Sequence, residues 1–245
     1  MRALVDDAYK SYGQKKVLQG VSFEIPSGSS LVVIGGSGNG KSVLMRCMIG
    51  LEKADKGRIV IDDVEVNGTK GNVYAALMRR IGVLFQAGAL FDSLPVWKNV
   101  AFSAIHHDGA SKKEALALAQ ATLEEVGLGK EALFLSPAEL SGGMQKRVAL
   151  ARAVASKPEL IFFDEPTTGL DPIMSEVING LIVNCRKKLG ATTFTITHDM
   201  HSAKTIADRV AWLHDGVIKW HGAPDELKNA QDPYLQSFLS GAGGA

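Results

Sequence analysis

The sequence is poor in cysteine and has no long apolar run, and each absence excludes a class of protein. Cys47 and Cys185 are the two cysteines among 245 residues. Two isolated cysteines make neither a disulfide framework nor a metal-site spacing, so we expect two buried, reduced thiols. The longest apolar runs, such as LVVIGG and LIFF, are far shorter than the roughly 18 residues that a membrane-spanning helix needs.

The sequence also lacks an excess of charge of either sign, and it lacks a signal peptide. Lys and Arg number 27 against 26 Asp and Glu, which argues against a nucleic-acid binder driven by bulk charge and leaves a local basic patch open. The first residues, MRALVDDAYKSYG, carry two acids where a signal peptide has an apolar run. We therefore expect a cytoplasmic protein that reaches any membrane through a partner. Its length suits one large domain or two small ones.

The first third of the chain predicts several short strands, one of them buried, and a helix. VLQGVSFEI (17–25) predicts a strand that ends at a turn. SLVVIGG (30–36) is continuously apolar before its glycines, as expected for a strand buried on both faces. KSVLMRCMIGL (41–51) has a helical pattern, and GRIVIDDVEVNG (57–68) predicts a β-ribbon bent at Asp62-Asp63.

The middle third changes to helices. QAGALFDSLPVWKNV (86–100) is apolar and aromatic, but it is too irregular for a helix and too interrupted for a central strand. Ser111 and Glu114 form a capping box that opens a helix, and Gly127 is placed to end it. MQKRVALARAVAS (144–156) predicts a second helix, with Met144, Val148, Ala151 and Ala155 on one stripe and a stop at Lys157-Pro158.

Strands return in the last third. ELIFF (159–163) and ATTFTITH (191–198) predict buried strands, and SEVINGLIVNCRKKLG (175–190) predicts an amphipathic helix closed by Gly190. RVAWLHDGVIKWHG (209–222) predicts a hairpin about Asp215-Gly216. DPYLQSFL (232–239) fits a short helix, and we expect the tail SGAGGA (240–245) to be disordered.

One segment has the pattern of a phosphate-binding loop. GGSGNGKS fits G-x-x-x-x-G-K-[ST] between a predicted strand and a predicted helix. Glycines let backbone N–H groups point at phosphate oxygens, and the N-terminal end of the helix favours the same negative charge. Lys41 supplies a full charge and the Ser42 hydroxyl can bind Mg²⁺. We predict that a nucleoside triphosphate binds to Gly35, Gly36, Ser37, Gly38, Asn39, Gly40, Lys41, Ser42 and Val43.

Two further segments complete the pattern. LIFFDEP places Asp164 at the end of a buried strand, where it can reach a metal, and Glu165 beside it points the other way and can polarise an attacking water. LSGGMQKR puts Ser141 at an N-cap, followed by glycines and a helix, which is a second design for binding an anion. Two such loops in one chain would be redundant unless they serve different nucleotides or meet across a dimer.

Together these motifs resemble the ATPase subunit of an ABC transporter, and the resemblance covers nearly the whole chain. It implies ATP and Mg²⁺ as ligands, with Ser42, Gln86 and Asp164 at the metal and Tyr12 stacked on adenine. It implies Glu165 as general base, with Gln86 and His198 also at the reacting phosphate. Asp171 matches the loop at the dimer interface. The signature residues Ser141, Gly142, Gly143, Met144 and Gln145 close over ATP held by a second copy of the chain.

The implied fold is a P-loop α/β core with a mainly parallel sheet, an antiparallel β subdomain and an inserted helical subdomain. We expect one ABC ATPase domain, in which 1–87 and 157–230 form the nucleotide-binding core, 88–156 form the helical signature subdomain, and 231–245 form a tail. In the resembled group such tails can pack on the neighbouring ATPase, although a helix folded on its own subunit is at least as compatible with the sequence.

Two departures refine the resemblance. Val43 replaces the usual second hydroxyl residue of the loop, and Met144 replaces the usual Gln of the signature. With the segment 86–100, these features resemble the Mla-type ATPases, which energise phospholipid transport with MCE-type lipid-binding proteins. The alternatives are an importer of polar solutes such as amino acids and, less favoured, a non-transport ABC ATPase acting on nucleic acid. The first two imply an integral membrane permease and a peripheral position on the cytoplasmic face of the inner membrane.

The segment after Gln86 then acquires an expected role. We predict that its apolar side chains line a groove for a coupling helix of the permease. A partly buried core segment is the alternative interpretation. The predicted docking residues are Leu90, Phe91, Leu94 and Trp97.

Overall fold

The computed structural model describes residues 1–240 and divides the chain into two compact units. One unit comprises Met1–Met78 and the chain from Ala191 onward, and the other comprises Arg79–Gly190. The predicted disordered tail, 240–245, falls largely on residues 241–245, which lie outside the described part of the chain. The P-loop α/β fold expected from the motifs is confirmed.

The first unit contains two groups of strands. An antiparallel sheet has the order β2-β1-β4-β5, and a second group places β3 between β8 and β9, parallel to both, with β10 antiparallel to β9. The strands are β1 (Ala3–Tyr12), β2 (Lys15–Ile25), β3 (Ser30–Ile34), β4 (Lys56–Ile61), β5 (Val64–Glu65), β8 (Thr192–Thr197), β9 (Arg209–His214) and β10 (Val217–Gly222).

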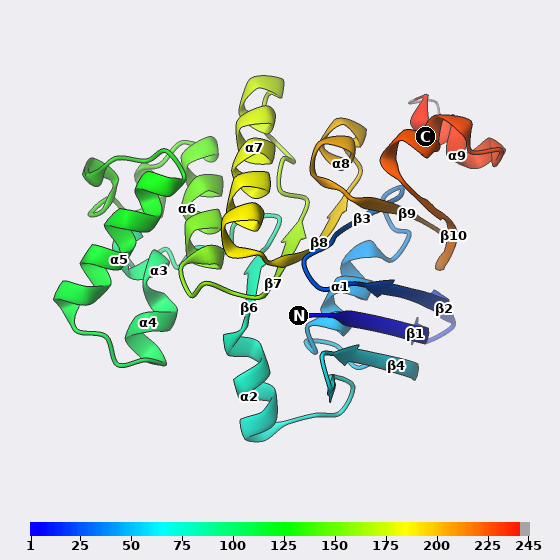
Figure 1. Ribbon diagram of the computed structural model, residues 1–245, viewed down its shortest axis with the longest axis horizontal. Helices are drawn as coiled ribbons and strands as arrows, with labels where there is room; N and C mark the ends of the chain where they lie inside the picture. Colours follow the sequence, from blue (N-terminus) through cyan, green and yellow to red (C-terminus); the bar gives the residue numbers. More distant parts are fainter. Residues whose placement is uncertain (241–245) are drawn as a thin grey trace. The chain divides into compact units, whose positions relative to one another are not determined.

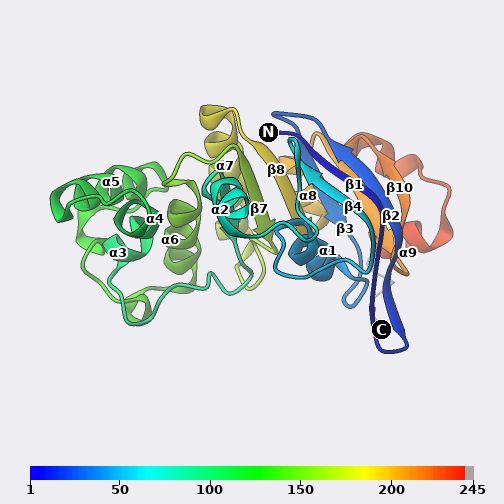
Figure 2. The same cartoon turned by 90° about the horizontal axis from the view of Figure 1, so that it is seen from below.

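Helices of the first unit pack on these strands. In Figures 1 and 2, α1 lies beside the strands, where it packs against β2 and β8. The helices are α1 (Lys41–Met48), α2 (Gly71–Arg79), α8 (Met200–Ile206), η3 (Pro224–Asn229) and α9 (Pro233–Leu239). Every residue of β3 and β8 is buried, and the rings of Phe23 and Phe194 stack with their centroids 5.8 Å apart. The continuous apolar pattern of 30–36 therefore correctly predicts a strand buried on both faces.

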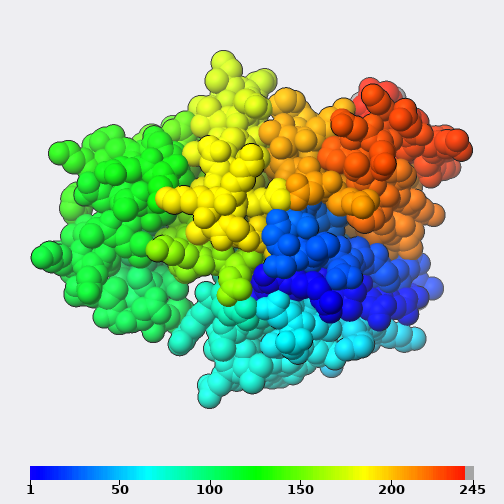
Figure 3. All heavy atoms as spheres, in the orientation of Figure 1, coloured from blue at the N-terminus to red at the C-terminus, as the bar shows by residue number. Residues whose placement is uncertain are grey.

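The predicted hairpin is present, and its turn is explained by two residues. Asp215 and Gly216 have φ values of 49° and 75°, as a two-residue turn between twisted strands requires. The backbone carbonyls of both residues accept hydrogen bonds from Gln19 of β2. β10 and β2 thus lie side by side, and Figure 3 shows the blue and orange segments meeting at the surface.

The second unit joins two parallel strands to a group of helices. β6 pairs with β7 from Ile81 opposite Leu160 to Leu84 opposite Phe163. α3 packs against α5 and α6, and α6 packs against β6 and α7, as the green and yellow helices of Figure 1 show. The elements are β6 (Ile81–Leu84), α3 (Val96–Val100), α4 (Phe102–His106), α5 (Lys112–Glu125), η1 (Lys130–Ala132), η2 (Pro137–Glu139), α6 (Gly142–Val154), β7 (Leu160–Asp164) and α7 (Pro172–Leu189).

Caps predicted from the sequence fix several helix ends. Ser111 and Glu114 form the capping box of α5, and Gly127 follows that helix with φ of 71°. Gly190 caps α7 in the left-handed conformation. Both cysteines are free thiols and buried, as expected. None of the helices in residues 1–240 is long and apolar enough to cross a membrane.

One expectation about the segment 86–100 is wrong, because its last five residues form the helix α3. Tertiary contacts impose this turn of helix. Asn99 is fully buried, and its amide nitrogen donates to the carbonyls of Leu94 (2.9 Å) and Phe91 (3.1 Å), while its oxygen accepts from the N–H of Phe91 (2.8 Å). The N–H groups of Val96 and Trp97 donate to carbonyls outside the helix.

Candidate functional site

The loop between β3 and α1 has the shape of an anion cradle. At Gly35 a Cβ would lie 2.4 Å from the Leu213 carbonyl oxygen, so only glycine fits there. Gly40 caps α1 with φ of 97°, a left-handed conformation that favours glycine. Lys41 is buried, and its ammonium donates to the carbonyls of Gly35 (2.7 Å) and Gly36 (3.1 Å). The lysine therefore lies folded against the loop whose N–H groups can face a phosphate.

Tyr12 ends β1 next to charged groups of the same unit. Its hydroxyl donates to the carboxylate of Glu52, which pairs with Arg46 of α1 (3.1 Å). The hydrogen bond to Glu52 raises the pKa of Tyr12 to about 12. The Lys10 ammonium lies over the ring, 5.4 Å from its centre, and the ring is 47% exposed. A tethered, partly exposed ring is suited to stacking on a flat base.

His198 follows the last residue of β8 and is exposed. The next residue, Asp199, is the N-cap of α8. Burial alone would raise the pKa of Asp199, but hydrogen bonds from the Ser202 hydroxyl and from the N–H groups of His201 and Ser202 hold it below its ordinary value. The capped turn thus fixes the backbone on the C-terminal side of His198.

In the second unit, the acidic pair follows β7 as predicted. Asp164 is the last residue of that strand. Glu165 is buried and has φ of 48°, an uncommon conformation for a residue other than glycine. The Thr168 hydroxyl donates to the Glu165 carboxylate across 3.2 Å, and the Thr168 N–H donates to the Glu165 carbonyl (3.3 Å). The turn after β7 therefore positions both ends of this glutamate.

A buried lysine connects this turn with Gln86. Gln86 lies beyond the end of β6, exposed. The ammonium of Lys146, on α6, donates to the Gln86 carbonyl and to the Glu165 carbonyl (3.5 Å). Burial lowers the pKa of Lys146, while the negative charges of Asp164 and Glu165 act in the opposite direction. Gln86, Lys146 and Glu165 are thus neighbours.

The glycines of LSGGMQKR lie at the start of α6. Ser141 is the N-cap, and its hydroxyl accepts from the Met144 N–H (3.3 Å). Gly142 is exposed, and Gly143 is half-buried beside Met174, whose terminal methyl would lie 2.9 Å from a Cβ on Gly143. The Gln145 amide turns away and donates to the Pro137 carbonyl (2.9 Å). The first turn of α6 therefore presents backbone N–H groups at the surface.

Asp171 is the N-cap of α7, where its carboxylate accepts from the N–H of Met174 (2.9 Å). Met174 also packs on Gly143 and lies 3.9 Å from the Arg147 guanidinium. Through Met174, the loop of Asp171 and the first turn of α6 are held together within this unit.

Comparisons with known proteins decide the family. The ABC transporter family matches residues 18–168, from β2 to the turn after Glu165. The chain belongs to the ABC transporter family. It is 38% identical to the histidine/lysine/arginine/ornithine transport ATP-binding protein HisP of Escherichia coli, over 97% of this chain and 96% of that protein.

Two further relatives of this ABC ATPase are a plant protein and a cassette of known structure. Protein TRIGALACTOSYLDIACYLGLYCEROL 3 of Arabidopsis thaliana is 38% identical over 96% of this chain and 72% of its own length. The dimeric structure of a post-hydrolysis state of the ATP-binding cassette MJ0796, bound to ADP and Pi, superposes with a TM-score of 0.84. It is 29% identical and covers 91% of this chain and 98% of the cassette.

The chain is therefore an ATPase that uses ATP with Mg²⁺. The residues present fit both ligands. The loop before α1 fits phosphate because its glycines hold a backbone conformation that a side chain would disrupt, and because Lys41 lies against this loop. Ser42 lies in the first unit, and Gln86 and Asp164 lie in the second. Their hydroxyl, amide and carboxylate oxygens are hard donors of the kind that Mg²⁺ prefers.

The structure divides the predicted docking residues into two pairs. A cavity of about 480 Å³ is lined by Leu94 and Trp97 but not by Leu90 or Phe91. Phe91 instead stacks on Phe102, with ring centres 4.6 Å apart, and lies under the Arg152 guanidinium. Trp97 is 7% exposed, so much of its ring belongs to the core.

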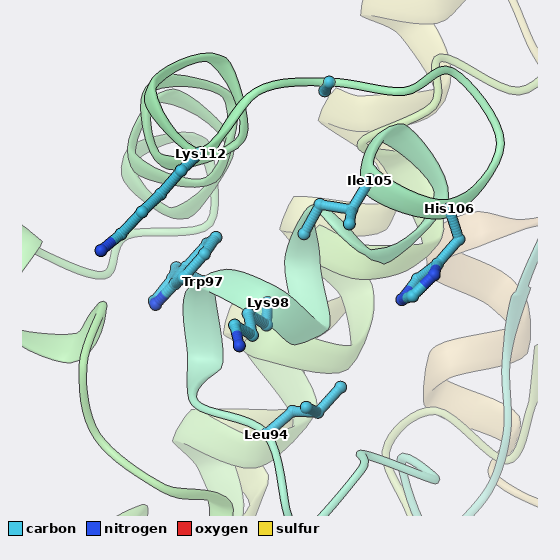
Figure 4. Close-up of a pocket in the computed structure, with 7 residues that line it drawn as sticks. Leu94, Trp97, Lys98, Ile105, His106 and Lys112 are labelled. Atoms are coloured by element: carbon cyan, nitrogen blue, oxygen red, sulfur yellow. The ribbon is translucent and has the colours of Figure 1, made fainter.

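Sequence reasoning missed the rest of this cavity. In Figure 4 its labelled side chains come from α3 and the loop before it, from α4 and from the start of α5. The additional lining residues are Lys98, Ile105, His106, Ala110 and Lys112. Separation along the chain concealed those of α4 and α5, since α5 begins 15 positions after Trp97, whereas Lys98 lies beside Trp97 and was passed over as a charged residue in an apolar segment.

Thr168 and Lys146 were also missed. Lys146 had a signal, because the residues three, four and seven positions later are apolar and share its helix face, so a charge on that face is expected to be buried. These residues are Ala149, Leu150 and Ala153. Thr168 lies in TTGLDP, three residues after the glutamate, and its hydroxyl contact depends on the positive φ of Glu165.

Proposed function

We propose that this chain is the ATPase subunit of an importer of polar solutes, with amino acids as the substrate class. The observation that carries the proposal is the likeness to the histidine/lysine/arginine/ornithine transport protein, which extends over nearly the full length of both chains. This choice reverses the order of preference from the sequence, where phospholipid transport stood first.

Phospholipid transport with an MCE-type partner is the second candidate. Val43 in the phosphate loop and Met144 in the signature favour it. A 38% identical relative is named after trigalactosyldiacylglycerol, which is a lipid, although this chain spans 72% of that relative. The phosphate and signature sites are predicted to bind nucleotide, so they favour neither substrate class.

In the proposed mechanism the phosphate loop binds the triphosphate through backbone N–H groups and the Lys41 charge. Glu165 acts as general base on the attacking water, and His198 and Gln86 contact the reacting phosphate from two other loops. Mg²⁺ supplies positive charge that offsets the charge of the phosphates. Thr168 and the backbone of the 165–168 turn hold the base in one orientation.

Two copies complete the site in this proposal. Ser141 and the N–H groups of the first turn of α6 close over the nucleotide of the second copy, and Asp171 lies at the dimer interface. Gly142, Gly143, Met144 and Gln145 belong to the same surface. A dimeric state is known for the cassette MJ0796, which resembles this chain.

The permease binds at the cavity that Leu94 and Trp97 line. Apolar and basic side chains both line this cavity, which suits an amphipathic segment with acidic side chains. The basic ones are Lys98, His106 and Lys112. The chain then lies peripherally on the cytoplasmic face of the inner membrane.

The test is reconstitution of the complex that this chain forms with its membrane subunits. The complex is placed in proteoliposomes, and ATP hydrolysis is measured with histidine, arginine or glutamine and the matching solute-binding protein. Stimulation by an amino acid supports the first proposal. Transfer of labelled phospholipid that depends on ATP, with no response to amino acids, would replace it with the second.

A further inference from the structure

Lys146 is a buried cation close to the predicted catalytic residues, and none of the motifs assigns it a role. Its side chain is 8% exposed, although lysine is seldom buried without a partner. It lies on α6, one turn after the signature glycines. An ammonium in this position costs desolvation energy, so its partners indicate what it does.

Those partners are two backbone carbonyls from different loops. One is the carbonyl of Gln86, after β6, and the other is the carbonyl of Glu165, after β7, at 3.5 Å. An ammonium carries three donors and no acceptor, so one lysine can hold two carbonyls at once. Through Lys146, α6, the helix that begins with the signature glycines and is called the signature helix below, is bonded to both loops of this unit that carry predicted catalytic side chains.

Each carbonyl belongs to a tight turn. The Glu165 carbonyl also accepts the Thr168 N–H (3.3 Å), and Glu165 has φ of 48°. In the other loop, the Gly88 N–H donates to the Phe85 carbonyl (2.8 Å), so the Gln86 carbonyl lies inside a tight turn. Backbone in such conformations persists where its surroundings hold it.

Arg152, two turns further along α6, provides the matched comparison. Its guanidinium donates to the carbonyls of Gly88 and Ala89, each at 2.7 Å. Arg152 thus holds the Gln86 loop from the same helix, but no contact joins it to Glu165 among the interactions described for the two residues. Both cations therefore contact the Gln86 loop, but only Lys146 also contacts the Glu165 turn.

We propose that Lys146 is a positioning residue for ATP hydrolysis, which holds the signature helix, the Gln86 loop and the Glu165 turn as one body. The proposal rests on the roles proposed above for Gln86 and Glu165. A shift of α6 on closing over a second copy would then move Gln86 and Glu165 with it, so that binding at the signature also sets the geometry of the base.

The test compares Lys146→Met, Lys146→Arg and Arg152→Met in the full chain. Steady-state kcat and KM for ATP are measured, together with the Kd of a fluorescent ATP analogue. We expect Lys146→Met to lower kcat by about tenfold to a hundredfold, the range of a displaced catalytic group. Its nucleotide Kd should change by less than about twofold, because Lys41 and the phosphate loop lie in the other unit. Lys146→Arg should recover most of kcat, since a guanidinium can donate to two carbonyls.

Hydrogen exchange gives a readout that is independent of turnover. In Lys146→Met, peptides covering 85–89 and 165–168 should both exchange faster, whereas in Arg152→Met only the peptide covering 85–89 should do so. Equal loosening of 165–168 in both variants would reduce Lys146 to general packing and overturn the proposal. So would unchanged kcat in Lys146→Met, or loss of nucleotide binding in step with kcat.

Two controls keep the result interpretable. If circular dichroism shows that Lys146→Met does not fold, Lys146→Gln replaces it, because its shorter amide cannot span both carbonyls. Faster exchange at 165–168 with lower kcat then supports the proposal, and wild-type values for both overturn it. Glu165→Gln is assayed in parallel: full turnover by that variant refutes Glu165 as base, and hydrogen exchange still decides whether Lys146 holds the turn.

Discussion

The hydroxyl of Thr168 donates a hydrogen bond to the carboxylate of Glu165, with 3.2 Å between Oγ1 and Oε2. The donor comes from the turn that the glutamate itself begins, since the Thr168 N–H donates to the Glu165 carbonyl. The orientation of the proposed base is thus set by Thr168, which lies three positions after Glu165 in the same turn. Burial of Glu165 strengthens the effect, because fewer water molecules compete for its oxygens.

This relationship predicts that Thr168→Val lowers kcat by about tenfold, since a hydrogen bond to a charged group contributes about 1.5–3 kcal/mol. KM for ATP should change little. Thr168→Ser keeps the hydroxyl and should retain most of the activity, as measured by phosphate release. Wild-type turnover in Thr168→Val would show that the contact has no part in catalysis.

Lys41→Ala should abolish ATP binding, because the phosphate charge then has no partner and the loop loses both bonds from Lys41 to its carbonyls. Isothermal titration calorimetry measures the loss, and circular dichroism checks that the variant is folded. Tight nucleotide binding by the folded variant would refute the phosphate site.

Glu165→Gln should bind ATP and accumulate as a closed dimer, since the amide keeps the shape of the side chain but cannot accept the proton of the attacking water. Size-exclusion chromatography with and without ATP measures the dimer. Lys41→Ala combined with Glu165→Gln is the control and should remain monomeric. Turnover of the single variant at the wild-type rate would remove Glu165 as base.

Leu94→Ser should weaken binding to the membrane subunits and leave ATP binding unchanged, because Leu94 is half-buried at the cavity and far from the phosphate loop in sequence. Trp97→Ala should have the same effect with an added loss of stability of about 3–5 kcal/mol, since its ring is mostly buried. Leu90→Ser is the matched control, because Leu90 does not line the cavity. Equal co-purification of Leu94→Ser and wild type with the permease would count against this docking surface.

Asp199→Ala should destabilise the protein at pH 7 by about 1 kcal/mol, the usual contribution of an N-cap. The folded-state pKa of Asp199 is lowered, so its charge stabilises the fold above the ordinary value of 3.8, and this contribution disappears as the pH falls through that value toward the folded pKa. Urea unfolding at several pH values measures the difference between variant and wild type. Asp199→Asn keeps the cap without the charge, so its own stability should lack the contribution of this titration. A difference between Asp199→Ala and wild type that stays constant with pH would contradict the assignment.

Local rules predicted much of the fold. The capping box of Ser111 and Glu114, the left-handed Gly190 and the turn at Asp215-Gly216 each depend on a few neighbouring residues, and all three are confirmed. The sequence left open whether the tail helix packs on its own subunit. In the structure Leu235 is fully buried, and the Tyr234 ring stacks on His214 of the same chain. The fold on its own subunit is the one observed.

The helix α3 could not be predicted in this way. Its short run after Pro95 has no periodicity to read, and its conformation is held by Asn99 and by carbonyls distant in sequence. The same reason explains the divided docking set, since Phe91 turns toward Phe102 and Arg152 and leaves the cavity to Leu94 and Trp97.

The sequence by itself determined the chemistry: the order and spacing of the phosphate loop, the signature and the acidic pair identify an ATPase because each motif carries its own backbone requirement. The tertiary structure alone decided which groups hold these motifs in place. Lys146 joins two loops that are distant from it in sequence, so its contacts depend on how those segments pack, and no local pattern of residues encodes them. Thr168 and Asn99 bond to near neighbours, but these contacts depend on the positive φ of Glu165 and on the turn of helix that distant carbonyls hold.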